Sequence, residues 1–295
     1  MFLVLGPETV EHALEPVRAL AQELGLAAGE TEIRARAAGA SYVCARIDAS
    51  GDLADEAAAR VRVLEVGAAA GCDVVLVSAE ELGRRRRLFV FDMDSTLIQG
   101  EVIDELAKLH GVADQVVAVT ASAMRGEIEF QESFRRRVAL LEGLKEERAR
   151  ELLGRIPVMP GAERLFTELK RRGAMTAVLS GGFTFFGAHL QERLGLDWVH
   201  ANELDVADGV VTGAVRGGIV DGARKAALLE EIAAREGLSM DETVAVGDGA
   251  NDLPMLRLAG LGVAFHAKPV VRASAKYAMT YVGLDGLLEL VSCKF

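Results

Sequence analysis

The chain has 295 residues, of which 51% are hydrophobic and 26% charged, a composition typical of a globular protein of about two domains and unlike that of a disordered one. Its net charge of −11 argues against nucleic acid as the main partner, because phosphate backbones are bound by basic surfaces. Cys44, Cys72 and Cys293 lack CxxC spacing, Met1–Leu5 is too short for a signal peptide, and no segment approaches the ~20 apolar residues of a membrane span. We therefore expect a cytoplasmic, reduced protein.

Residues 1–83 are expected to form a small module of their own. Apolar periodicity predicts strands and helices in the order βαββαβ, which is typical of a ferredoxin-like fold. This order resembles that of an ACT-type regulatory domain. The expected strands are Phe2–Leu5, Thr31–Ala37, Ser41–Ile47 and Asp73–Val77, and the expected helices are Glu8–Leu24 and Leu53–Ala70.

The run Arg84–Arg87 separates this module from the remaining residues, 88–295. Four adjacent arginines could bind phosphate or nucleic acid, but the acidic overall charge favours a solvated basic linker. Beyond it, strand-like and helical segments alternate, which predicts an α/β domain with a Rossmann-like parallel sheet. The expected strands are Leu88–Phe91, Met175–Leu179, Thr243–Val246, Leu261–Ala264 and Tyr277–Thr280.

Two insertions interrupt this alternation. Residues 102 to about 155 are helical in pattern throughout and far exceed the length of one crossover helix, so we expect a helical cap over the active edge of the sheet. The second insertion, Asn202–Gly217, contains Asp208-Gly209 between alternating segments, and this dipeptide predicts a β-hairpin.

Polar residues gather where the predicted strands end, and in open α/β sheets ligands bind outside the carboxyl ends of the strands. Together these residues supply what phosphoryl transfer requires: a carboxylate nucleophile, a hydroxyl and backbone N–H groups for phosphate oxygens, an ammonium group against negative charge, and a second carboxylate for a hard cation. They are Asp92, Asp94, Ser180, Gly181, Gly182, Lys225, Asp248, Asn251 and Asp252.

Other motif interpretations fail on detail. Asp92-x-Asp94-x-Thr96 begins like a calcium loop, but Leu97 stands where an EF-hand needs glycine. The chain has no GxxxxGK[ST] motif, and Asp248–Asp252 lacks the GxGxxG pattern of a dinucleotide site.

The four motifs D-x-D-x-T, S-G-G, a single lysine and G-D-G-x-N-D resemble those of the haloacid dehalogenase-like superfamily, over residues 88 to about 290. The resemblance implies that Asp92 forms an aspartyl-phosphate, and that Asp94 protonates the leaving group and later activates water. It also implies a Mg²⁺ ion bound by Asp92, Asp248 and the Asp94 backbone carbonyl, with Asn251 and Asp252 orienting these ligands. Asp94 must begin protonated, so we predict a raised pKa for it.

Residues of the cap point to a substrate class. On spacing alone, Glu101 and Arg137 would be ordinary helix residues. The segments around Asp92–Glu101, Met124 and Phe130–Val138 are, however, similar to the phosphoserine phosphatase family. That resemblance implies that Glu101 and Arg137 bind the ammonium and carboxylate of an amino acid, with Met124 and Phe130 covering it.

The leading hypothesis is Mg²⁺-dependent hydrolysis of O-phospho-L-serine to L-serine and phosphate, the last step of serine biosynthesis. A related phosphatase or phosphotransferase acting on another small metabolite, such as phosphohomoserine, is the alternative. A signalling module that only stores a phosphoryl group is disfavoured, since Asp94 would hasten its hydrolysis. For residues 1–83 three roles stay open: binding serine as an effector, homodimerisation and structural support.

Overall fold

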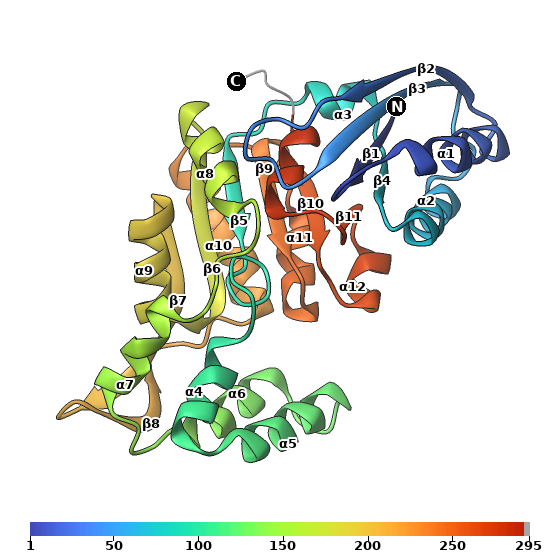
Figure 1. Cartoon of the computed structure of the whole chain (residues 1–295). Helices are drawn as coiled ribbons and strands as arrows, with labels where there is room; N and C mark the ends of the chain where they lie inside the picture. Colours follow the sequence, from blue (N-terminus) through green and yellow to red (C-terminus); the bar gives the residue numbers. More distant parts are fainter. Residues whose placement is uncertain (292–295) are drawn as a thin grey trace.

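A computed structural model of the chain describes residues 1–291, so Cys293 lies outside the described residues. Two sheets organise the molecule, a four-stranded antiparallel sheet near the N-terminus and a seven-stranded, mostly parallel sheet behind it (Figure 1). No helix among the described residues is both long and apolar enough to cross a membrane.

The N-terminal module has the predicted βαββαβ order and the strand order β2-β3-β1-β4, with every pairing antiparallel. The strand expected at Thr31–Ala37 instead begins at Ala27, because α1 ends beside Gly25, whose φ of 73° turns the chain straight back into the sheet. Helix α2 begins later than expected, since Asp55 caps it. The elements are β1 (Phe2–Gly6), α1 (Glu11–Glu23), β2 (Ala27–Arg34), β3 (Val43–Ser50), α2 (Glu56–Ala70), β4 (Asp73–Leu76) and α3 (Ala79–Gly83).

Both faces of this sheet are covered. Phe2 and Val4 of β1 pack under α1 and α2, whereas the alternate residues Leu3 and Leu5 join the hydrophobic core that continues into the second sheet. A fully buried leucine contributes about 1.5–3 kcal/mol relative to an exposed one. The module is therefore packed onto the rest of the protein through its second face.

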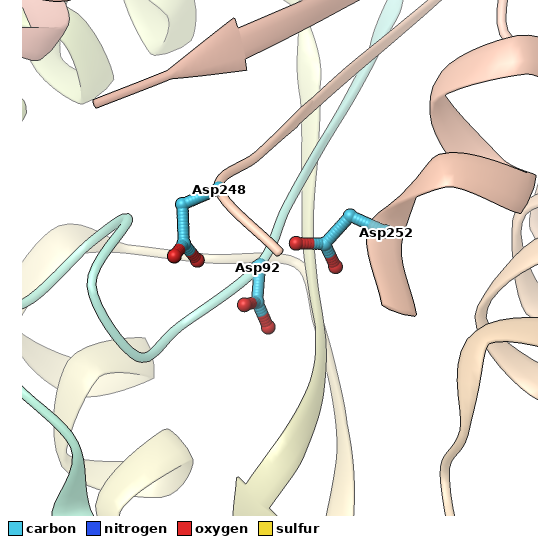
Figure 2. A group of neighbouring side chains, drawn as sticks. All are labelled: Asp92, Asp248 and Asp252. Carbon is cyan, nitrogen blue, oxygen red and sulfur yellow. The ribbon is translucent and has the colours of Figure 1, made fainter. Parts of the chain in front are cut away.

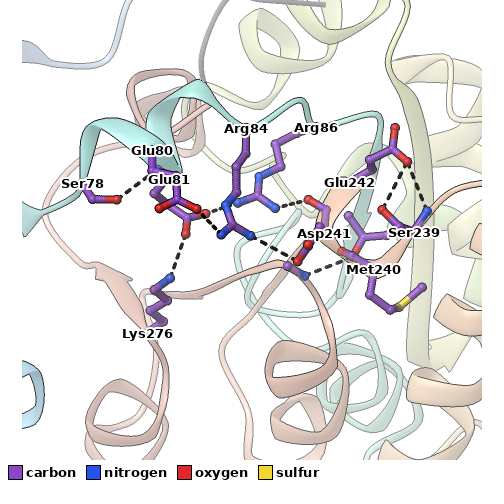
Figure 3. Close-up of polar contacts among 12 residues, drawn as sticks. Ser78, Glu80, Glu81, Arg84, Arg86, Ser239, Met240, Asp241, Glu242 and Lys276 are labelled. Atoms are coloured by element: carbon purple, nitrogen blue, oxygen red, sulfur yellow. Dashed lines mark hydrogen bonds and ion pairs between the residues drawn. The ribbon is translucent and has the colours of Figure 1, made fainter.

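One residue of the arginine run between the sheets, Arg86, is not solvated as the charge of the run suggested. Arg86 is 2% exposed and forms a buried ion pair with Glu81, which also receives the ammonium of Lys276 at 2.8 Å. Arg86 also donates to the backbone carbonyl of Asp241 (Figure 3). A nearby carboxylate, Glu81, and the distant carbonyl of Asp241 thus stabilise a charge that the sequence alone would place at the surface.

The second sheet has the order β11-β10-β9-β5-β6-β7-β8, with only the β7–β8 pair antiparallel. Leu88 and Val90 of the central strand face α10 and α11, while Phe89 and Phe91 face the core beneath α8 and α9, so this strand is buried on both sides, as predicted. The elements are β5 (Leu88–Phe91), α8 (Ala162–Arg171), β6 (Met175–Phe183), α9 (Thr184–Leu194), β7 (Trp198–Ala207), β8 (Val210–Arg216), α10 (Gly222–Arg235), η2 (Met240–Glu242), β9 (Thr243–Gly247), η3 (Ala250–Asp252), α11 (Leu253–Leu258), β10 (Leu261–Phe265), α12 (Pro269–Ser274), β11 (Tyr277–Met279) and η4 (Leu284–Glu289).

The long insertion is helical, as predicted, and lies beyond the carboxyl end of β5 (Figure 1). The predicted hairpin is also present: Asp208 and Gly209 both have positive φ between β7 and β8. Strand β7 starts before the expected insertion, and β8 is tied to the cap by Gly143 N–H to Val211 O at 2.9 Å. The cap elements are α4 (Val102–His110), α5 (Ala113–Met124), α6 (Phe130–Ala139), α7 (Glu146–Arg150) and η1 (Glu151–Gly154).

Candidate active site

Three neighbouring strands bring the predicted motifs together. Asp92 follows β5, which lies between β6 and β9, and Asp248 follows β9. Ser180 does not follow β6 as expected but lies within it, because pairing with β7 resumes at Phe183 after a bulge. Bulges re-aim side chains and backbone groups beside active sites, and this one contains Ser180-Gly181-Gly182.

Lys225 connects two of the acids. Helix α10 begins at Gly222, because Asp221 accepts a hydrogen bond from Arg224 N–H at 2.9 Å and caps it. Lys225 is completely buried, and its ammonium donates to Oδ1 of Asp92 and to Oδ1 of Asp252, both at 2.6 Å. Burial alone would lower the pKa of Lys225, but Asp252 and Asp92 raise it, so the group is charged.

The negative charge here exceeds the positive. The carboxylates of Asp92, Asp248 and Asp252 offer oxygens within 4.8 Å of one another, and Asp248 and Asp252 lie on either side of Asp92 (Figure 2). Burial, followed by Asp252, raises the pKa of Asp92 well above its usual range, and burial with Asp252 and Glu101 raises the pKa of Asp248 to about 7. Three acids against one ammonium leave a buried excess of negative charge that a cation would relieve.

The carboxylate oxygens of Asp92, Asp248 and Asp252 differ in whether they already accept a hydrogen bond. Asp252 accepts from Lys225 with Oδ1 and from Gly249 N–H with Oδ2 at 2.9 Å. Within residues 1–291, no hydrogen bond reaches Oδ2 of Asp92 or the carboxylate of Asp248. Carboxylate oxygens are the ligands that hard cations such as Mg²⁺ prefer, so this donor set fits such an ion at Asp92 and Asp248.

Asp94 occupies a different environment from Asp92. Its Oδ1 accepts the N–H of Val102 at 2.8 Å at the start of α4. Burial and the nearby Glu101 raise the pKa of Asp94 to about 8, which agrees with the raised pKa predicted from the sequence. On the other side, a Cβ added to Gly182 would come within 2.4 Å of Asp94 Oδ2, so only glycine lets the Ser180 bulge approach this closely. The raised pKa and the contact with the Ser180 bulge make Asp94 the candidate proton donor of the site.

The residues predicted to bind the amino acid differ in their surroundings. Glu101 accepts from the Ser95 hydroxyl at 2.9 Å, and Phe130 lies against Gly181, where an added Cβ would be 3.3 Å from its ring. Met124, at the end of α5, is 73% exposed. Asn251 lies in η3 and its backbone packs against Gly222 at the start of α10.

Arg137 lies on α6 with a buried Nε that has no hydrogen-bond partner among the described residues. Burial lowers the pKa of Arg137, while Glu101, Asp104 and Asp94 oppose that shift, which places these acids within electrostatic reach of the guanidinium. A buried N–H without an acceptor costs free energy unless a ligand supplies one.

Sequence reasoning missed two polar contacts. Asn202 of β7 is 1% exposed, donates to Gly181 O at 2.8 Å and accepts from Val220 N–H at 2.9 Å. Gln131 of the cap donates to Asp221 Oδ2 at 2.6 Å. Asparagine is depleted in strands, and its presence within β7 could have drawn attention to the first contact.

Comparison with known proteins identifies relatives over most of the chain. A model of the haloacid dehalogenase-like hydrolase family matches residues 89–257. The phosphoserine phosphatase of Archaeoglobus fulgidus is 45% identical over 80% of this chain and 69% of its own length. Those of Streptomyces coelicolor and Idiomarina loihiensis are 49% and 50% identical, over 79% and 70% of this chain; the chain spans 57% of the first and 92% of the second.

Solved structures resemble the same regions. A haloacid dehalogenase family hydrolase from Salmonella enterica covers 100% of this chain and 99% of its own, with a TM-score of 0.89 and 28% identity. A phospho-aspartyl intermediate analogue of a phosphoserine phosphatase covers 71% of this chain and 100% of its own, with a TM-score of 0.67 and 42% identity. The first of these shares the N-terminal sheet region as well as the parallel sheet.

Proposed function

The chain belongs to the haloacid dehalogenase-like hydrolase family, and we propose that it hydrolyses O-phospho-L-serine to L-serine and phosphate. Three observations support the proposal: the buried pair of Asp92 and Lys225, the raised pKa of the nearby Asp94, and the buried Nε of Arg137, which has no hydrogen-bond partner among the described residues. The relatives named phosphoserine phosphatase, at 45–50% identity, support this substrate.

Asp92 and Asp94 divide the chemistry. A carboxylate oxygen of Asp92 attacks phosphorus, and the bond from phosphorus to the serine oxygen breaks. Asp94 gives its proton to that oxygen, which leaves as the serine hydroxyl. The ionised Asp94 then takes a proton from a water molecule, whose oxygen attacks the aspartyl-phosphate and releases phosphate. Asp92 returns as a carboxylate and Asp94 as an acid, so the cycle closes.

In both steps the phosphoryl oxygens would be held by an ammonium, that of Lys225, and a hydroxyl, that of Ser180. Lys225 is fixed between Asp92 and Asp252, so its ammonium stands beside the nucleophile before substrate arrives. The Ser180 hydroxyl accepts the N–H of Gly182 at 2.8 Å, and its own proton is therefore available to a phosphoryl oxygen.

We propose Mg²⁺ as the cofactor, held by Asp92, Asp248 and the backbone carbonyl of Asp94. The excess of buried carboxylates and the open oxygens of Asp92 and Asp248 support this assignment. When bound, the ion would supply positive charge against the phosphoryl oxygens and the nucleophile. Asp252, whose two oxygens are already engaged, would orient the site together with Asn251.

Residues of the cap and of its entry would bind the amino-acid part of the substrate. Arg137 would bind the carboxylate, which supplies the acceptor its buried Nε lacks, in the two-pronged geometry a guanidinium favours. Glu101, oriented by Ser95, would accept the ammonium. Phe130 contacts the Gly181 bulge and would close the pocket above the phosphoryl group.

A phosphate-release panel tests the substrate. The purified chain is assayed with Mg²⁺ or EDTA on phosphoserine, on phosphoethanolamine, which lacks the carboxylate, and on 3-phospholactate, which carries a hydroxyl in place of the amine. We expect phosphoserine to give the highest kcat/KM and EDTA to abolish release. Equal hydrolysis of all three would refute the roles of Glu101 and Arg137 and favour another small phosphometabolite.

A further inference from the structure

Asn202 joins two segments that each carry a phosphate-binding group. Its side chain is buried within β7, where it donates from Nδ2 to the carbonyl of Gly181 and accepts at Oδ1 from the N–H of Val220. A carbonyl can only accept and an N–H can only donate, so these two partners fix the orientation of the amide. The donor and the acceptor of the side-chain amide are therefore both hydrogen-bonded to backbone groups of other segments.

The first contact controls the Ser180 hydroxyl. The Gly181–Gly182 peptide donates its N–H to Ser180 Oγ at 2.8 Å and receives Asn202 at its carbonyl at 2.8 Å. The C=O and N–H of a trans peptide point in opposite directions, so the hydrogen bond that fixes the Gly181 carbonyl also fixes the direction of the Gly182 N–H. Because Ser180 Oγ accepts that N–H, its own proton is directed elsewhere, toward the phosphoryl group.

The second contact controls the segment that leads to Lys225. Val220 precedes Asp221, which caps α10 and whose carbonyl accepts the N–H of Lys225 at 2.9 Å. Asn202 therefore fixes the entry to the first turn of this helix, from which the Lys225 ammonium reaches Asp92.

We propose that Asn202 is a positioning residue that sets the Ser180 hydroxyl and the Lys225 ammonium in the mutual arrangement that binds a phosphoryl group. It touches no reacting atom and acts through these two. The proposal rests on the phosphohydrolase chemistry proposed above, but not on the identity of the amino-acid part of the substrate.

The test is a binding measurement with inorganic phosphate. Asn202→Leu keeps the size of the side chain and removes both hydrogen bonds; Asn202→Ser is smaller, keeps one polar group and serves if the first variant does not fold. Calorimetry on the Mg²⁺-loaded protein should show phosphate binding weakened by about 10- to 100-fold, the range expected when buried polar groups lose their partners. Mg²⁺ binding, measured without phosphate, should stay within about twofold of the parent.

Thr243→Val is the matched control. Thr243 is fully buried, and like Asn202 it bridges backbone groups of two segments, donating to Met240 O at 2.7 Å and accepting from Gly260 N–H at 3.3 Å. It lies at the start of β9, at the opposite end of that strand from Asp248. This variant should be destabilised comparably and should bind phosphate as the parent does.

The proposal would be overturned by Asn202 variants that bind phosphate with parental affinity, or by a loss of phosphate affinity that Thr243→Val shows equally. A parallel loss of Mg²⁺ affinity in the Asn202 variants would also overturn it, since the whole site would then have been disturbed. If the parent binds phosphate but fails to hydrolyse phosphoserine, the substrate proposal fails and the role of Asn202 is still decided by the phosphate titration.

Discussion

Replacing Arg86 should destabilise the protein far more than replacing its neighbour in the same arginine run. Arg86→Met would remove a guanidinium that is 2% exposed and leave Glu81, which is 6% exposed, with Lys276 as its remaining ion-pair partner (Figure 3). Breaking a buried ion pair by removing one partner costs about 3–5 kcal/mol, because the other charge stays desolvated. At roughly 2 °C per kcal/mol for a chain of this size, the melting temperature should fall by about 6–10 °C.

The assay is thermal and urea unfolding of four proteins: the parent, Arg86→Met, Arg85→Met and the double variant Glu81→Gln/Arg86→Met. Arg85 is exposed, so its replacement should change the free energy of unfolding by less than about 0.5 kcal/mol. The double variant should recover part of the loss, since it also removes the buried charge of Glu81, which Arg86→Met deprives of its buried partner and leaves with the more exposed Lys276. Equal effects of Arg86→Met and Arg85→Met would refute the buried-pair reasoning.

Three further outcomes are expected. Asp94→Asn should lower kcat by about 10²- to 10⁴-fold, the usual contribution of a general acid–base, and full retained activity in a phosphate-release assay would contradict its role. Arg137→Lys should raise KM for phosphoserine by about 10-fold or more, because the two-pronged contact is lost, while leaving phosphoethanolamine hydrolysis unchanged; an equal change for both substrates would argue against a carboxylate contact. Burial raises the pKa of Cys44 to about 12, so at pH 8 only about one thiol in 10⁴ is ionised, and mass spectrometry should find Cys44 unlabelled by iodoacetamide in the native protein but labelled in urea.

The sheet and its motifs were predictable because their information is local. A run such as Leu88–Phe91, apolar on both faces and followed directly by acids, is diagnostic of a buried parallel strand and its active end. Spacing also identified the hairpin, since Asp208-Gly209 has the backbone freedom that a tight turn between two strands requires.

The failures share a cause in long-range contacts. The burial of Arg86 depends on the carbonyl of Asp241, 155 residues further along the chain, which no local pattern reveals. Strand β6 passes through the Ser180 bulge because β7 pairs with it again beyond Leu179, which no local pattern shows. The role inferred for Asn202 likewise depends on two backbone groups 18 and 21 residues away in the chain.

The two-faced N-terminal sheet has a consequence for how the protein is made. The second face of that sheet, with Leu3 and Leu5, belongs to the same hydrophobic core as Leu284 and Leu287 of η4; Leu5 lies beside Gly286, and Ser41 donates its N–H to Asp285. During translation residues 1–83 are made before residue 284, so this apolar face lacks its cover from η4 until the later segment has been synthesised. Contacts between segments so far apart in the sequence also slow folding.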